Sequence, residues 1–169
     1  MDLLQFDAKD LYFDQEDSLE VRNLIQFASE LYGSGQAELP LLKAYLRAPE
    51  SLNVLVALNR FYYYQHRLSE ALLIAEKALV LIHRDIGFPD DWRDLQLQHI
   101  SRAPEELLTR IRLYLFTLKS IGFLHMRLMN LPLSRGIFEK LVTLDDKDRI
   151  GAKGLLDLVM RKQGPQCAE

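Results

Sequence analysis

Cysteine is almost absent from the sequence. Its 169 residues include a single cysteine, Cys167, so we expect no intramolecular disulfide bond. The 8 glycines and 6 prolines are too few for a collagen-like or low-complexity chain. The formal net charge of -3, from 21 basic and 24 acidic side chains, argues against a general nucleic-acid-binding protein. The sequence as a whole is 49% hydrophobic and 27% charged, a composition typical of a protein that buries a hydrophobic core.

Long uncharged apolar runs are also lacking. The most apolar region, 107–133, is interrupted by Arg110, Arg112, Lys119 and Arg127, which a membrane-spanning helix tolerates only at a high free-energy cost. The N-terminus lacks the basic start and apolar stretch of a secretory signal. We therefore expect a cytoplasmic protein without a membrane partner. At 19.6 kDa, one compact domain is the starting expectation.

Apolar residues recur at helical spacing along most of the chain. The pattern predicts helices over 19–31, 39–46, 52–62 and 72–81, with turns at Gly33-Ser34-Gly35 and His66-Arg67. No segment shows the alternation and flanking turns typical of a strand. The sequence therefore predicts an all-α fold.

Small residues repeat along this helical pattern. Ala37 and Ala71 lie 34 residues apart, and so do Ala44 and Ala78. Alanine is expected where the two helices of a pair approach closely, with larger residues filling the space around it. The spacing therefore predicts helix pairs with a 34-residue period.

With this period the chain resembles the tetratricopeptide repeat family, in units that begin at Ser18, Leu52 and Leu115. The resemblance implies a right-handed stack of antiparallel helix pairs, an α-solenoid of about three repeats with a C-terminal capping helix. A non-repetitive helical bundle with coincidental alanine spacing is the alternative. At the positions that the family prefers, the three units carry Val21, Leu24, Ile25, Ala28, Ala37, Leu41, Ala44 and Pro49; Leu55, Leu58, Asn59, Tyr62, Ala71, Ala75, Ala78 and His83; and Leu118, Ile121, Gly122, His125, Ser134, Phe138, Leu141 and Asp146.

The register divides the chain into segments. An insertion separates the second and third units; Asp90 or Asp91 is expected to cap a short helix in it that carries Trp92, and Pro104 to start the extended first helix of the third unit. The insertion either packs back on the repeats or contacts a partner. The predicted segments are an acidic leader (1–17), two units (18–85), the insertion (86–114), a third unit (115–148), a capping helix (149–163) and a tail (164–169).

Catalytic and cofactor motifs are not evident in the sequence. The glycines at 33 and 35 follow no strand, so they predict no dinucleotide-binding loop. The acids at 146–151 resemble half of a calcium loop, but Ile150 replaces an oxygen ligand, and capping of the final helix explains these acids better. We interpret the leader acids as a solvated charge run. These leader acids are Asp7, Asp10, Asp14, Glu16 and Asp17. The four histidines, His66, His83, His99 and His125, lack the spacing of metal ligands, so we expect no bound metal. Because no catalytic or cofactor motif is evident either, we expect no enzyme activity and no cofactor.

The family binds its partners on a concave face lined by first-helix residues. The matching residues here combine basic and aromatic side chains, which implies a groove for an extended or helical segment of another protein that carries carboxylates. Alternatively, the basic chains only solvate the surface and the aromatics pack on the insertion or the leader. The predicted groove residues are Arg22, Gln26, Asn53, Arg60, Tyr63, Tyr64, Lys119, Phe123, Met126 and Arg127.

The family's two-carboxylate clamp is not predicted here, because Ala57, Phe116 and Ser120 stand at three of its positions. An adaptor or chaperone-like role is the leading interpretation. One alternative is a self-associating structural protein, for example a homodimer joined through 86–103 or the stack ends. Another is an accessory factor of a bacterial assembly system, because the chain is similar in size to type III secretion chaperones and 59–71 resembles small repeat proteins found with nitrogen-fixation functions.

Overall fold

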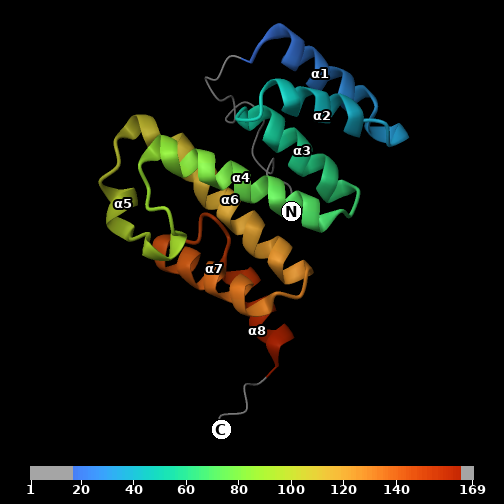
Figure 1. Ribbon diagram of the computed structural model, residues 1–169. Coiled ribbons are helices and arrows are strands. Elements are labelled where there is room, and N and C mark those ends of the chain that lie inside the picture. The colour runs from blue at the N-terminus through green and yellow to red at the C-terminus, as the bar shows by residue number, and fades with distance from the viewer. Residues whose placement is uncertain (1–16, 165–169) are drawn as a thin grey trace. The chain divides into compact units, whose positions relative to one another are not determined.

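The computed structural model describes residues 17–164, and all regular secondary structure within them is helical (Figure 1). The predicted all-α class is confirmed. The α-helices are α1 (Leu19–Glu30), α2 (Glu38–Arg47), α3 (Leu52–Tyr64), α4 (Leu68–Ile86), α5 (Leu97–Ser101), α6 (Leu108–Arg127), α7 (Leu131–Leu144) and α8 (Lys153–Gln163), and the 3-10 helices are η2 (Tyr32–Ser34), η3 (Trp92–Asp94) and η4 (Glu105–Leu107).

The chain divides into two compact units rather than the single domain that its length suggests. The described residues of the N-terminal unit are 17–81, and those of the C-terminal unit are 82–164. The boundary falls within α4, which contributes residues to both units. Within residues 17–164, no helix is both long enough and apolar enough to cross a membrane.

In the N-terminal unit, α1 packs against α2 and α2 against α3 (Figure 1). Ser18 caps α1 by accepting a hydrogen bond from the backbone N–H of Val21 at 3.3 Å. The alanines at 28, 37 and 44 are completely buried, and their small side chains let the helices approach closely. Gly35 ends the turn after α1 with φ 72°, as the glycine pair in the sequence predicts.

The α3–α4 pair begins at a Ser51 cap and turns at His66, which adopts φ 57°. The two helices are joined by a buried hydrogen bond, in which the Asn59 Nδ2 donates to the carbonyl oxygen of Ala71 at 2.7 Å. Both residues are buried, so this bond forms out of water.

In the C-terminal unit, α6 and α7 form the corresponding pair. The Ser134 hydroxyl donates to the carbonyl oxygen of Gly122 at 2.7 Å. A Cβ atom at Gly122 would lie 2.9 Å from Cγ2 of Ile137 and 3.0 Å from Cε1 of Phe138. Only glycine therefore permits this approach of α6 to α7.

The insertion folds differently from the single short helix expected. Asp91 caps η3 by accepting from the backbone N–H of Arg93 at 2.9 Å, and α5 follows as a separate helix. Lys140 of α7 donates to the carbonyl oxygen of Leu95 at 3.1 Å, and Leu95 is only 1% exposed. The insertion therefore packs back on its own unit, which confirms one of the two alternatives. The helix α6 begins at Leu108, seven residues before Leu115 and four residues after the predicted start at Pro104, because Glu105–Leu107 form the separate 3-10 helix η4.

The capping helix starts at Lys153, later than the predicted residue 149. The chain cannot be helical earlier, because Asp148 and Gly151 adopt φ values of 50° and 70°. The Asp148 carboxylate accepts from the backbone N–H groups of Ala152 and Lys153, as the capping interpretation predicts. The leader acids before Asp17, and Cys167 in the tail, lie outside the described residues.

Candidate functional site

The exposed end of α3 gathers basic and aromatic side chains in the N-terminal unit. The guanidinium of Arg60 lies over the ring of Tyr64, 5.8 Å from its centroid, because residues four apart on a helix share a face. The rings of Tyr63 and Tyr64 meet edge to face with centroids 5.6 Å apart. Tyr64 is 51% exposed although it is aromatic. These three residues form what we call the Arg60 cluster.

Three further residues of the predicted groove lie in the same unit. Arg22 and Gln26 are exposed on α1, a helix that contacts α3. Asn53, near the start of α3, donates from Nδ2 to the Asp17 carboxylate at 2.7 Å. The structure thus brings the Arg60 cluster together directly and places Arg22 on a neighbouring helix.

The other four predicted groove residues lie on α6 in the C-terminal unit. The Arg127 guanidinium is exposed and lies 5.9 Å from the ring centroid of Phe123, which is half-buried. Lys119 and Met126 are buried, with 6% and 2% exposed. The expectation that these two side chains line an open face is therefore corrected. That the other eight residues share one groove stays a prediction.

Lys119 is held inside the C-terminal unit by the loop between α7 and α8. Its ammonium donates a hydrogen bond to the carbonyl oxygen of Ile150. Burial lowers the pKa of Lys119, and the negative charge of Asp148 partly opposes this effect. The group therefore ties α6 to the loop and does not serve as a free surface charge.

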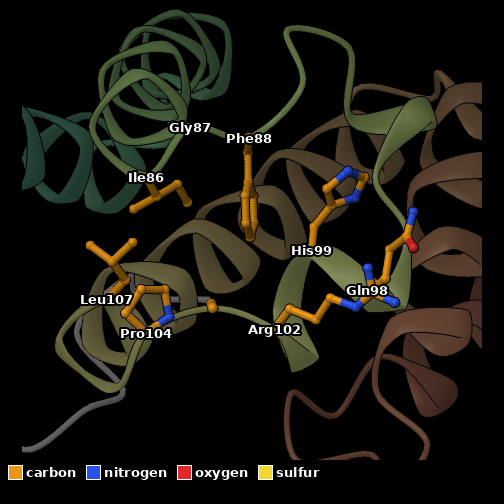
Figure 2. A pocket seen from close by; sticks show the side chains of 9 residues that line it. Ile86, Gly87, Phe88, Gln98, His99, Arg102, Pro104 and Leu107 are labelled. Carbon is orange, nitrogen blue, oxygen red and sulfur yellow. The ribbon is translucent and has the colours of Figure 1, made fainter.

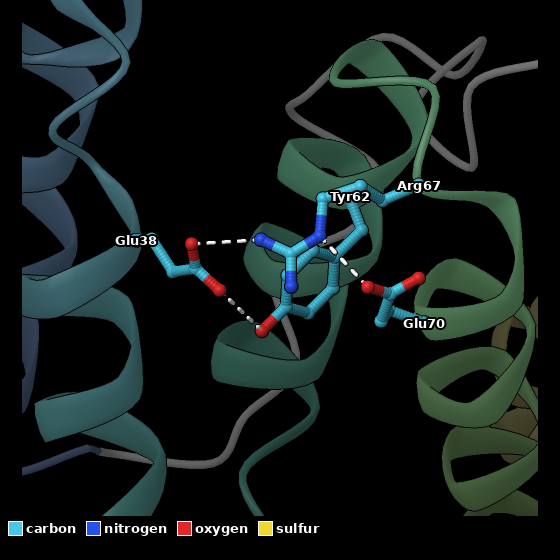
Figure 3. A network of polar contacts seen from close by, with 4 residues as sticks. All are labelled: Glu38, Tyr62, Arg67 and Glu70. Carbon is cyan, nitrogen blue, oxygen red and sulfur yellow. Dashed lines mark hydrogen bonds and ion pairs between the residues drawn. The ribbon is translucent and has the colours of Figure 1, made fainter.

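A polar network joins α2, α3 and α4 in the N-terminal unit. Figure 3 shows the Arg67 guanidinium between two carboxylates: it donates to Glu38 at 2.7 Å and to Glu70 at 2.8 Å. It also lies 4.6 Å from the ring centroid of Tyr62, whose hydroxyl donates to Glu38 at 3.3 Å. The i, i+3 spacing of Arg67 and Glu70 is visible in the sequence, whereas Glu38, 29 residues away, is brought close only by the fold.

The titration behaviour of this network follows from its contacts. The hydrogen bond from Arg67 holds the pKa of Glu70 below its usual range, and the bonds to Glu70 and then Glu38 raise that of Arg67. Burial, followed by the charge of Glu38, raises the pKa of Tyr62. The shifts of Arg67 and Glu70 come first from the bond between them, and the contacts of Arg67 and Tyr62 with Glu38 join α2 to the α3–α4 turn, so we interpret the network as a clamp that holds the three helices together.

A pocket of about 330 Å³ lies in the C-terminal unit (Figure 2). The sequence did not predict this pocket, and the only sequence feature related to it is the length of the insertion. Figure 2 shows apolar side chains on one side of Phe88 and polar side chains on the other. The lining residues are Ile86, Gly87, Phe88, Gln98, His99, Arg102, Ala103, Pro104 and Leu107.

The four histidines belong to different elements of the fold. His66 occupies the α3–α4 turn, and His99 lines the pocket. His83 and His125 are buried, and the Nδ1 of His83 lies 3.8 Å from a carboxylate oxygen of Asp90. Across residues 17–164, no three His, Cys, Asp or Glu side chains are grouped so that they could hold a metal ion.

The chain is similar to one curated protein of Azotobacter chroococcum mcd 1. The two sequences are 40% identical over 159 residues, which is 94% of this chain and 89% of the relative. The relative is described as an uncharacterized 19.8 kDa protein in the nifW 5' region. No protein-family model matches the chain, and no solved structure matches it significantly.

Proposed function

The chain belongs to the family of the uncharacterized 19.8 kDa protein in the nifW 5' region, and we propose that it is a protein-binding accessory factor associated with nitrogen fixation. The name of the relative supports the association, because it places that protein beside a nif gene. In this proposal the protein acts in the cytoplasm as an adaptor or chaperone and catalyses no reaction.

We propose further that the helix pairs are repeats of the tetratricopeptide type. Support comes from two buried hydrogen bonds, Asn59 to Ala71 and Ser134 to Gly122, which join the same two positions of the 34-residue register. At both places the first helix of a pair contacts the second where the register requires a close approach. A repeat predicts that this contact recurs, and a non-repetitive bundle does not predict it.

The Arg60 cluster is the proposed binding surface. The observation that carries the proposal is the exposed Tyr64 ring beneath the Arg60 guanidinium, 5.8 Å from its centroid. Arginine and tyrosine are the residues that most often dominate binding energy at protein interfaces. A basic aromatic surface fits a segment with carboxylates and apolar side chains, and the exposed Arg22 adds a second positive charge on α1, which contacts α3.

Capture of partners from the native host tests this proposal. The tagged full chain would be expressed in cells grown with and without fixed nitrogen, and the captured proteins identified. We expect a partner that is enriched under nitrogen-fixing growth. Capture of that partner should fall at least tenfold with Arg22→Glu and Arg60→Glu together, because the reversed charges repel carboxylates.

Arg149 and Arg161 provide a matched control. Both side chains are exposed in the C-terminal unit. Changing both to Glu alters the net charge by the same amount as changing Arg22 and Arg60 to Glu. The control variant should capture the partner as the unchanged protein does. Capture by the Arg22 and Arg60 variant at the wild-type level, with unchanged circular dichroism, would exclude the Arg60 cluster as the binding surface. Arg127→Glu tests the Arg127–Phe123 pair separately.

A further inference from the structure

The pocket in the C-terminal unit is built entirely by the insertion. Its lining residues run from Ile86 to Leu107, within the segment 86–114 that the 34-residue register does not require. None of them belongs to the Arg60 cluster. The departure from the repeat pattern has therefore created a hollow that the proposed protein-binding role does not use.

The floor of the pocket is apolar and held in place. Gly87 ends α4 with φ 66°, and the backbone N–H of Phe88 then donates to the carbonyl oxygen of His83 at 3.1 Å. The Phe88 ring is 7% exposed and packs edge to face on Tyr114, with centroids 5.2 Å apart. Figure 2 shows Ile86 and Leu107 on the same side of this ring. The position of Phe88 is therefore fixed by its packing.

The polar side presents hydrogen-bond donors. His99 accepts at Nδ1 from the backbone N–H of Gln96 at 2.9 Å, which places the proton of a neutral imidazole on Nε2. Arg102 carries five N–H donors, and its guanidinium makes no hydrogen bond or ion pair with any residue in the range 17–164. Gln98 already donates to Gln96 at 2.7 Å. The exposed Arg102 guanidinium and the Nε2 of His99 are thus available to donate to an acceptor in the pocket.

From this division we propose that the pocket binds a small organic carboxylate with an apolar body. The apolar body lies against Ile86, Phe88 and Leu107, and the carboxylate accepts from Arg102, which matches its planar geometry with two parallel donors. The volume of about 330 Å³ lies at the lower end of the range for ligand sites, so it suits a small molecule. This site is independent of the partner proposed for the Arg60 cluster.

Titration of the ¹⁵N-labelled full chain with three probes tests the proposal. Hexanoate has both the apolar body and the carboxylate, hexanamide has the same body without charge, and acetate has the charge without the body. We expect hexanoate to bind in the millimolar range or tighter and to shift the amide signals of Gly87, Phe88, His99 and Arg102. Hexanamide and acetate should each bind at least fivefold more weakly, because hexanamide lacks the carboxylate and acetate lacks the apolar body. Absence of these shifts up to about 10 mM hexanoate, or equal binding of hexanamide, overturns the proposal.

Two variants separate the site from the rest of the surface. Arg102→Gln should weaken hexanoate binding roughly tenfold, because it removes the charged donor and keeps the length of the side chain. Arg112→Gln changes another exposed arginine, which does not line the pocket, and should leave binding unchanged. Ala103→Leu should also abolish binding by filling the hollow, and it alters a half-exposed position that the core does not need. Unchanged binding by both Arg102→Gln and Ala103→Leu contradicts the assignment.

Discussion

Ser134 donates from its hydroxyl to the carbonyl oxygen of Gly122 across the α6–α7 interface, at 2.7 Å. Asn59 and Ala71 make the equivalent contact between α3 and α4 at the same distance, with the donor on the first helix instead of the second. The two pairs use different side chains to achieve the same close approach. If these pairs are repeats, as we propose, the position of the contact matters more than the residue type that makes it.

Gly122→Ala should destabilise the C-terminal unit. The added Cβ would lie within 3.0 Å of both Ile137 and Phe138, and overpacking of this kind costs about 1–3 kcal/mol. The higher helix propensity of alanine returns only about 1 kcal/mol, so the steric effect wins. Urea denaturation followed by circular dichroism measures the change in the free energy of unfolding.

Gly136→Ala is the matched control on the facing helix. There an added Cβ meets Cη2 of Trp92 at an ordinary contact distance of 3.7 Å. The propensity gain then dominates, and the variant should be more stable by about 0.5–1 kcal/mol. Equal effects of the two substitutions would mean that α6 and α7 do not approach closely at Gly122.

Arg67→Gln should raise the pKa of the Glu70 carboxyl towards its usual range, while the hydrogen bond from the backbone of Glu70 continues to lower it. In the unchanged protein the bond from Arg67 favours the ionised carboxylate and lowers this pKa. A carbon-detected NMR titration of the side-chain carboxyl measures the change. Arg135→Gln, which removes the exposed Arg135–Glu139 pair, should leave the Glu70 titration as it was.

The same bond predicts how stability depends on acid. A carboxyl whose folded pKa is depressed stabilises the protein above its unfolded pKa, and this contribution is lost as the pH falls through the folded value. The unchanged protein should therefore lose more stability between neutral pH and about pH 3 than Arg67→Gln does. Identical acid dependence of the two urea midpoints would argue against the clamp.

Tyr114 should be among the last tyrosines to ionise. Burial, with a smaller contribution from the charge of Asp91, raises its pKa to about 12. Because the folded pKa lies above the unfolded value of about 10, stability from the neutral phenol is complete below pH 10 and is lost towards pH 12. Absorbance titration should show this component in the unchanged protein and not in Tyr114→Phe, which keeps the contact with Phe88. Ionisation of Tyr114 near pH 10 in the folded protein would contradict the burial argument.

Local signals in the sequence were enough for most of the helices. Ser18 caps α1, Gly35 turns the chain, and the alanines of the register are buried, all as their residue types predict. The side chain of Ser18 and the positive φ of Gly35 act within a few residues, so they are readable from sequence alone.

Contacts between residues far apart in the sequence could not be predicted from local patterns. The resemblance to tetratricopeptide repeats predicts an open position for Lys119, but the α7–α8 loop brings the Ile150 carbonyl to its ammonium. The late start of α8 follows from the left-handed backbone of Asp148, which side-chain patterns do not encode. The pocket likewise depends on how the insertion folds back on α7, and the sequence left that open.

Site-specific photo-crosslinking in the native host tests the central claim most directly, that the Arg60 cluster contacts a partner protein. A benzophenone amino acid in place of Tyr64 keeps an aromatic side chain at a position that is 51% exposed, and the same amino acid in place of Thr143, which is exposed on α7, provides the control. We expect a covalent adduct with one partner from position 64, absent from position 143 and lost when Arg60→Glu is added. Adduct formation at position 143 and none at position 64 would contradict the binding surface proposed here.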